Sequence, residues 1–286
     1  MKHLNSLKTL ALAATLVFGG AAHAHRGWML PSATVLSGHE PWVTVDAAIS
    51  NDVFYFEHNA MRLDNLVVHA PDGSTVKPEN QGTGRYRSTF DVRLAQKGTY
   101  KMAVVADAMF ASFKVGGETR RVRGSAESLA KDIPANATEL NVSHNISRNE
   151  IFVTSGKPSG GVLKPTGRGL ELVPVTHPND LVVGETAKFR FLLDGQPAAG
   201  ITVTVIPGGI RYRDKLEEQK LTADAQGEVS IQWAGPGMYW LNAAPARAGG
   251  DGEGMGGAEA PRGAAGTLAK PTRRATYATT LEVLPQ

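Results

Sequence analysis

Short segments in which apolar and polar residues alternate occur along most of the chain. The first series includes WVTVDAAIS (42–50), LDNLVVHAP (63–71), YRSTFDVRL (86–94), TYKMAVVAD (99–107) and FASFKVGG (110–117). Alternation with a period of two is typical of a β-strand with one buried face. Gly, Pro and Asp turn residues separate these segments at short intervals. We therefore expect an all-β sandwich of antiparallel strands rather than a parallel α/β sheet.

A second series of alternating segments follows a stretch rich in Gly, Pro and Ser. Its members are LELVPVTHP (170–178), AKFRFLLDGQPAAG (187–200), ITVTVIPGG (201–209), the long run 220–245 and RATYATTLEVL (274–284). Two series around one linker predict two β-sandwich domains, at 25–155 and 169–286, joined by residues 156–168. One helix is expected over 125–134, with Ser125 as its N-cap and Pro134 as its stop.

Residues 247–271 differ in composition from the rest of the second domain. They read RAGGDGEGMGGAEAPRGAAGTLAKP, in which Gly, Ala and Pro dominate. Such a segment lacks the apolar side chains needed for a core, so we expect a disordered loop. Because it lies between two strand candidates, it is predicted to be the long loop of a hairpin.

The first 24 residues have the features of a secretory signal peptide. Lys2 and Lys8 precede a short apolar run, Leu10–Phe18, and Ala22-His23-Ala24 fits the small-x-small cleavage rule. The apolar run is too short to span a bilayer. Cleavage after Ala24 predicts an exported, periplasmic protein that does not span the membrane and begins at His25.

Composition narrows the classes of partner and cofactor. The chain contains no Cys, which excludes disulfides and thiolate metal ligands. It has 30 Lys and Arg against 27 Asp and Glu, and the signal peptide removes two of the lysines. The mature protein is therefore nearly neutral and has no dense basic stripe, so nucleic acid is not expected as a partner.

His25 has a special chemistry if the signal is cleaved after Ala24. Its free α-amine and its ring Nδ1 can chelate one metal ion, and a second imidazole would complete a three-nitrogen histidine brace. Nitrogen ligands of this kind suit Cu(II) and Ni(II). The ordinary pKa of an α-amine is close enough to neutrality for metal binding to displace its proton. The alternative is an accidental polar residue at the first position.

The segment NDVFYFEHNAMRLDNL (51–66) supplies the candidates for the remaining ligands. His58 is the candidate for the second imidazole, with the carboxylates of Asp52 and Glu57 near it. For each histidine other than His25, a structural or solvated role is an open alternative. In a mature chain that begins at His25, no HxH, HxxxH or HExxH spacing is present, which argues against the zinc-enzyme classes.

Catalysis and glycan binding have weaker support in the sequence. The chain has no GxSxG elbow and no cysteine nucleophile, so we do not expect an enzyme. An aromatic sugar-binding platform is one use for Trp28, Trp42 and the Phe54-Tyr55-Phe56 run. The other interpretation places these five residues in strands and cores.

Several long segments of the mature chain together resemble a known family. They are AHAHRGWMLPS (22–32), WVTVDAAISNDVFYFEHNAMRLDNLVVHAPDG (42–73), GRGLELVPVTHPNDLVVGETAKFRFLLDGQPAAGITVTVIPGG (167–209) and TADAQGEVSIQWAGPGMYWLNA (222–243). They resemble bacterial periplasmic proteins identified as components of cobalt and nickel uptake, often called NikM-like. The portion LDGQPAAGITVTV…TADAQGEVSI also resembles Ig-like or transthyretin-like sandwiches, which concerns the fold alone.

The residues and the resemblance together predict a periplasmic transition-metal-binding accessory protein linked to nickel or cobalt uptake. The resemblance favours Ni or Co, whereas the ligand type and the affinity order favour Cu. A metal transporter or an outer-membrane receptor is the expected partner. The alternative is a non-catalytic cell-surface or glycan interaction module without metal. A copper oxidase of polysaccharides also begins with histidine, but it needs a flat aromatic face and ranks last.

Overall fold

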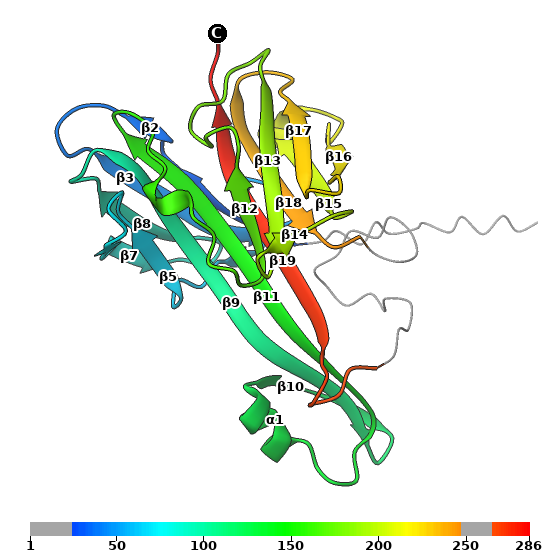
Figure 1. Ribbon diagram of the computed structural model, residues 1–286. Helices are drawn as coiled ribbons and strands as arrows, with labels where there is room; N and C mark the ends of the chain where they lie inside the picture. The colour runs from blue at the N-terminus through cyan, green and yellow to red at the C-terminus, as the bar shows by residue number, and fades with distance from the viewer. Residues whose placement is uncertain (1–24, 247–264) are drawn as a thin grey trace, which may run out of the picture.

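The chain folds mainly into β-strands arranged in three sheets (Figure 1). The structure is a computed structural model, and it describes residues 25–246 and 265–286. The expected all-β class is thus confirmed. The signal peptide, 1–24, and most of the loop 247–271 lie outside the described residues. Within the described ranges, no helix has the length and apolar character needed to cross a bilayer.

The two outer sheets are antiparallel. The N-terminal sheet has the order β1-β3-β8-β7, with β4 beside β3; its strands are β1 (Arg26–Pro31), β3 (Trp42–Ser50), β4 (Asn59–Ala60), β7 (Glu79–Thr83) and β8 (Ser88–Arg93). The C-terminal sheet has the order β12-β13-β14, with β17 beside β13; its strands are β12 (Leu170–Pro174), β13 (Thr186–Leu193), β14 (Gln196–Pro197) and β17 (Glu228–Gln232).

The central sheet has ten strands, in the order β16-β15-β18-β19-β11-β9-β5-β6, with β10 beside β9 and β2 beside β11. Its strands are β2 (Val35–Leu36), β5 (Leu66–His69), β6 (Thr75–Val76), β9 (Gly98–Val115), β10 (Glu118–Gly124), β11 (Thr138–Ser155), β15 (Thr202–Pro207), β16 (Gln219–Thr222), β18 (Gly237–Ala244) and β19 (Thr272–Val283). The short helices are α1 (Ala126–Asp132), η1 (Gly161–Leu163) and η2 (Ile210–Tyr212).

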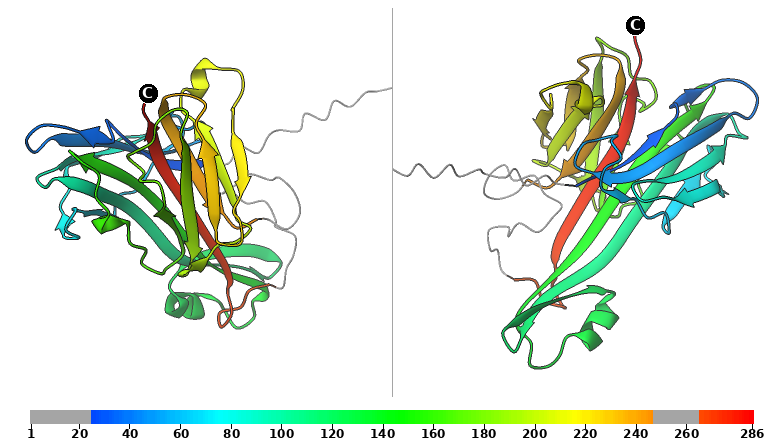
Figure 2. Two further views of the ribbon diagram at one scale, coloured as in Figure 1. Left: turned by 45° about the horizontal axis from the view of Figure 1, so that its top comes forward. Right: turned by 180° about the vertical axis from the view of Figure 1, so that it is seen from behind.

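The last strand, β19, joins the two halves of the chain. It pairs antiparallel with β18 and parallel with β11, so that Tyr277 lies opposite both Ala243 and Arg148. Figure 2 shows the N-terminal and C-terminal strands on either side of the parallel pair β11 and β19. The antiparallel pairing of β18 and β19 is that of the hairpin expected around the Gly-rich loop. The division into two domains at 156–168 stays a prediction, because the central sheet runs through both.

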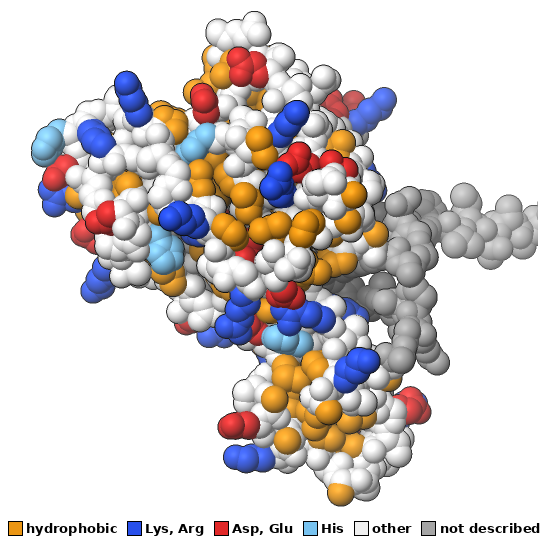
Figure 3. Space-filling view, in the orientation of Figure 1, with side chains coloured by type: hydrophobic (Ala, Val, Ile, Leu, Met, Phe, Trp, Pro, Cys, Tyr) orange, Lys and Arg blue, Asp and Glu red, His pale blue; other side chains and the backbone are white. Residues whose placement is uncertain are grey.

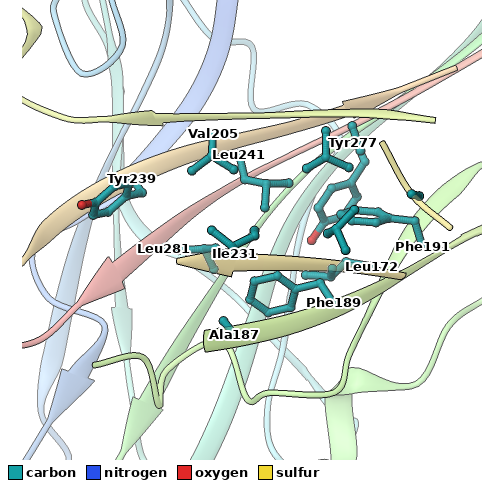
Figure 4. Close-up of a cluster of buried hydrophobic side chains, with 14 of the residues drawn as sticks. Leu172, Ala187, Phe189, Phe191, Val205, Ile231, Tyr239, Leu241, Tyr277 and Leu281 are labelled. Atoms are coloured by element: carbon teal, nitrogen blue, oxygen red, sulfur yellow. The ribbon is translucent and has the colours of Figure 1, made fainter. Parts of the chain in front are cut away.

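Two hydrophobic cores lie on the two ends of the central sheet. The N-terminal core packs Met29, Val45 and Phe90 against Tyr100 and Met102 of β9. The C-terminal core is larger, and Figure 4 shows its side chains converging from both sheets. Its members include Leu172, Phe189, Phe191, Leu241, Tyr277 and Leu281. The observed architecture is therefore two sandwiches that share one sheet.

Strand β9 is longer than the sequence pattern predicts, and β11 lies in a segment for which that pattern predicts no strand. The separate strands expected at 99–107 and 110–117 are one strand of 18 residues, because Ala108 and Met109 continue the extended backbone without a turn residue. Both long strands continue beyond the sandwiches into an arm that carries β10 and α1 (Figure 1). Helix α1 is confirmed: Ser125 Oγ accepts a hydrogen bond from the Ser128 N–H, as an N-cap does.

Candidate functional site

The N-terminal strand β1 is fixed from its first residue. Arg26 lies opposite Ser50 of β3, and Trp28 is fully buried. The Trp28 Nε1–H donates to Ser50 Oγ at 2.7 Å. The Gly27 carbonyl accepts from Trp240 Nε1 at 3.0 Å, which ties β1 to the C-terminal half of the chain. His25 is therefore the residue directly before an anchored strand.

The loop after β3, residues 51–58, is closed by its own glutamate. Glu57 Oε1 accepts hydrogen bonds from the backbone N–H groups of Asn51, at 2.8 Å, and Asp52, at 2.9 Å. The Ser50 hydroxyl donates to the Asp52 carbonyl at 2.5 Å. The backbone of Phe54 has a φ of 63°, the left-handed region in which the chain turns back. These contacts return the loop toward the start of β1.

The structure brings His25 and His58 together. Their rings stack with centroids 3.8 Å apart and an interplanar angle of 17°. His25 is half-buried, whereas His58 is exposed. The ring nitrogens hold their lone pairs in the ring planes, so two nearly parallel rings do not direct them at one point. One ring must therefore turn about its side-chain bonds for both to bind the same ion.

The side chains alone do not complete a metal site. Among residues 25–246 and 265–286, no three or more His, Asp or Glu groups are gathered so as to hold a metal ion. The two imidazoles need a further donor, and the α-amine of a chain beginning at His25 is a nitrogen of the right kind. The donor set thus fits a three-nitrogen site only in the cleaved protein.

The two residues predicted to supply carboxylate ligands differ in the group that forms hydrogen bonds. Glu57 is occupied by the backbone amides of Asn51 and Asp52, a contact that shapes the loop. At Asp52 it is the backbone carbonyl oxygen that accepts hydrogen bonds, from the Ser50 hydroxyl and, at 3.3 Å, from the Tyr55 N–H. The structure does not gather either carboxylate with the histidine pair into a metal-binding group. A ligand role for Asp52 or Glu57 therefore stays a prediction.

The other histidines lie apart from this pair in the chain and in their contacts. His39 is exposed in the turn before β3. The Nε2 of His144 is 2.6 Å from Asp107 Oδ1. His177 belongs to a polar network in which its Nδ1 accepts from the Asn179 N–H at 3.1 Å. His69 lies on β5, opposite Lys101 of β9.

The aromatic residues around the loop form a small core rather than a flat platform. Trp28 packs edge-on against Phe54, with centroids 5.6 Å apart, and against Phe56 at 5.4 Å. With Ile206 and Trp240 they make a third hydrophobic cluster, which joins the two sandwiches. Trp42, by contrast, is 45% exposed on its own strand.

The C-terminal half supplies contacts that the sequence pattern did not reveal. The guanidinium of Arg211 lies over the Tyr55 ring, 4.5 Å from its centroid. A Cβ at Gly208 would lie 2.9 Å from the Met238 carbonyl oxygen and 3.1 Å from the Phe54 ring, so only glycine fits this approach. The loop 51–58, which carries His58, is thus contacted by residues from both halves of the chain. The Gly208-Gly209 pair after β15 is the one sequence feature that could have indicated these contacts.

Comparison with known proteins gives one family and a number of distantly similar solved structures. The model of the family described as "Domain of unknown function (DUF4198)" matches residues 22–246. No curated protein matches the sequence. The human OSCAR ligand-binding domain is 14% identical, with 78% of this chain and 91% of that one covered and a TM-score of 0.18. An ICAM-5 D1–D4 ectodomain fragment is 10% identical, covering 77% and 46%, with a TM-score of 0.19. Both TM-scores are too low to support an inference about this chain.

Proposed function

The chain belongs to the DUF4198 family, whose function is unknown, and we propose that this member is a periplasmic transition-metal-binding accessory protein. In this proposal the signal peptide is removed after Ala24. The new α-amine and ring of His25 then bind one divalent ion together with the ring of His58. Asp52 and Glu57 remain further ligand candidates. The protein presents its metal to a transporter or an outer-membrane receptor and carries out no reaction of its own.

The observation that carries this proposal is the contact between the His25 and His58 rings. These residues are 33 positions apart in the chain, and their centroids are 3.8 Å apart. The Trp28, Ser50 and Trp240 hydrogen bonds fix β1, so the terminus does not have to be ordered when the ion binds. Two imidazoles and an amine suit Cu(II), Ni(II) and Co(II), and the resemblance to nickel and cobalt uptake proteins favours the last two.

The proposal is tested by titrating three metals into proteins with defined first residues. We expect mature protein beginning at His25 to bind Ni(II), Co(II) or Cu(II) more tightly than a variant with one extra Ala before His25. The His58→Asn variant should also lose at least about tenfold in affinity, since it removes a ligand. His39→Asn, a change at an exposed turn, is the matched control and should bind as the wild type does.

Equal affinity of the mature and Ala-extended proteins for all three metals would contradict the N-terminal chelate. Mass spectrometry of the exported protein gives the position of cleavage in the same preparation. A mature terminus other than His25 would likewise overturn the proposal, because no free amine would then stand beside the two rings.

A further inference from the structure

One face of the central sheet is only partly covered by the C-terminal sheet. Phe152 of β11 belongs to the C-terminal core and lies opposite Lys101 of β9, so both side chains are on this face. On β5, His69 lies opposite Lys101, and Val67 opposite Ala103. The same face thus continues from the C-terminal core across β9 to β5. Figure 3 looks onto it and shows a histidine beside a basic side chain over β5.

The uncovered part of this face is a groove of about 590 Å³. Its lining runs from β5 and β9 to β11 and the loop before β12. Val67, Ala103 and Val105 make an apolar strip along the groove, and Val67 is 41% exposed. A strip of this kind binds the hydrocarbon part of a small ligand, and the volume is within the range of small-molecule sites.

Hydrogen-bond donors without acceptors stand at one end of the apolar strip. In the part of the chain that the structure describes, the side chains of Lys101 and His69 have no hydrogen-bond or ion-pair partner. Both line the groove, on adjacent strands. A lysine beside a histidine, both half-buried, favours a carboxylate or another small anion.

The acidic residues of the groove are already matched by cations. Asp64 forms an ion pair with Arg62 at 2.8 Å. Asp107 accepts from Arg168 and is in contact with His144. These two carboxylates therefore do not compensate Lys101.

The far end of the groove contains a buried arginine. Arg148 lines the groove and is 7% exposed, and its charge is balanced by Glu150, 3.0 Å away, and by Glu171. Its Nε is buried and has no acceptor among the described residues. The groove thus has donors at both ends, but among residues 25–246 and 265–286 only the end with Lys101 has an uncompensated charge.

We propose that this groove binds a small organic anion with an apolar chain. The anionic group lies at Lys101 and His69, and the chain lies over Val67, Ala103 and Val105. A medium-chain carboxylate is the simplest molecule with these two parts. The groove uses neither His25 nor His58, so the proposal does not depend on metal binding.

Octanoate is a suitable probe, with octyltrimethylammonium as the cation of matching chain length. We expect octanoate to bind the mature protein at one saturable site and the cation to bind far more weakly. Lys101→Met keeps the apolar stem, so the fold is retained, and it should weaken octanoate binding at least about tenfold through loss of a charge-assisted hydrogen bond. Lys114→Met, on the same strand but outside the groove, should leave the affinity unchanged.

Two readouts decide the outcome. Calorimetry gives the affinities, and methyl NMR should show octanoate-dependent shifts at Val67 and Val105 but not at Val115. The proposal is overturned by equal affinity of the wild type and Lys101→Met. It is also overturned by equal binding of the cation, or by methyl shifts confined to other parts of the protein. His58→Asn should bind octanoate normally, which separates this site from the proposed metal site.

Discussion

Glu57 and His58 are neighbours in the chain, but their contacts imply different roles. His58 is exposed and stacked on His25, whereas Glu57 accepts from two backbone amides of its own loop. Loss of the acceptor of a buried or half-buried N–H group lowers the free energy of unfolding. The main role of Glu57 is therefore to stabilise the loop. The sequence indicates His58 as the partner of His25 because its segment follows a strand, where a loop can return toward the N-terminus. The role of Glu57 could not be predicted, since it depends on the local turn.

Two substitutions at Glu57 separate the structural role from a ligand role. Glu57→Ala should lower the free energy of unfolding by about 1–3 kcal/mol, because it strands the Asn51 and Asp52 amides. Glu57→Gln keeps a neutral acceptor, so it should retain most of the stability and also the metal affinity. Urea unfolding and metal titration measure the two quantities. Normal stability with a clear loss of metal affinity in Glu57→Gln would instead assign Glu57 as a ligand.

His177 makes stability depend on pH. Burial lowers its pKa from the ordinary 6.5, because the charged ring is disfavoured, although Ser159 and Asp180 act in the opposite direction. Since the folded pKa lies below the unfolded one, the neutral ring stabilises the fold above pH 6.5, and this contribution is lost as pH falls. Protonation of Nδ1 would also remove the acceptor of the Asn179 N–H.

Replacement of His177 by Gln should therefore flatten the pH dependence of unfolding. We expect the loss of stability between about pH 7.5 and about pH 5 to be smaller in His177→Gln than in the wild type. Urea unfolding at the two pH values gives the difference. The same pH dependence in both proteins would show that the titration lies elsewhere.

Most single strands follow from sequence alternation, but their lengths and partners do not. Residues 42–50 form β3 over the full expected range. The turn Asp194-Gly195 has two positive φ values and joins β13 to β14, as the dipeptide predicts. The parallel pairing of β19 with β11 joins residues more than 120 positions apart. Such a non-local pairing leaves no mark in local periodicity.

Strand β1 is the element that positions the candidate site, and Trp28 is its anchor. Trp28→Ala removes a fully buried side chain and its hydrogen bond to Ser50, so it should cost about 3–5 kcal/mol of stability. Where the variant remains folded, metal affinity should also fall, because His25 is no longer held beside His58. Thermal unfolding and metal titration measure both effects. Unchanged metal affinity in a destabilised variant would show that β1 does not position the ligand.

On the scale of the whole molecule, one sheet connects two cores. The sequence predicts two domains because a Gly- and Pro-rich segment separates two strand series. The structure keeps the two cores but joins them through β11 and β19, and through the cluster of Trp28, Ile206 and Trp240. The candidate histidine pair stands beside that cluster, which is why both halves of the chain contribute to its loop.

The shared sheet predicts cooperative unfolding. Melting of either core would expose an edge of β11 or β19 and break the third cluster, so the mature protein should unfold in one calorimetric transition. The calorimetric and van't Hoff enthalpies should then be equal. Two resolved transitions in scanning calorimetry would show that the halves are independent domains, as the sequence alone predicts.

A chain that begins at His25 is proposed to hold a metal ion between its own terminus and His58. Anomalous diffraction at the nickel edge, from crystals of the mature protein grown with NiCl2, would locate this ion. We expect one anomalous peak in bonding contact with the His25 α-amine, the His25 ring and the His58 ring, with at least one ring turned out of the stack. A fully occupied peak at other residues would contradict this placement, as would the absence of a peak beside these two histidines in crystals grown with Ni(II), Co(II) and Cu(II).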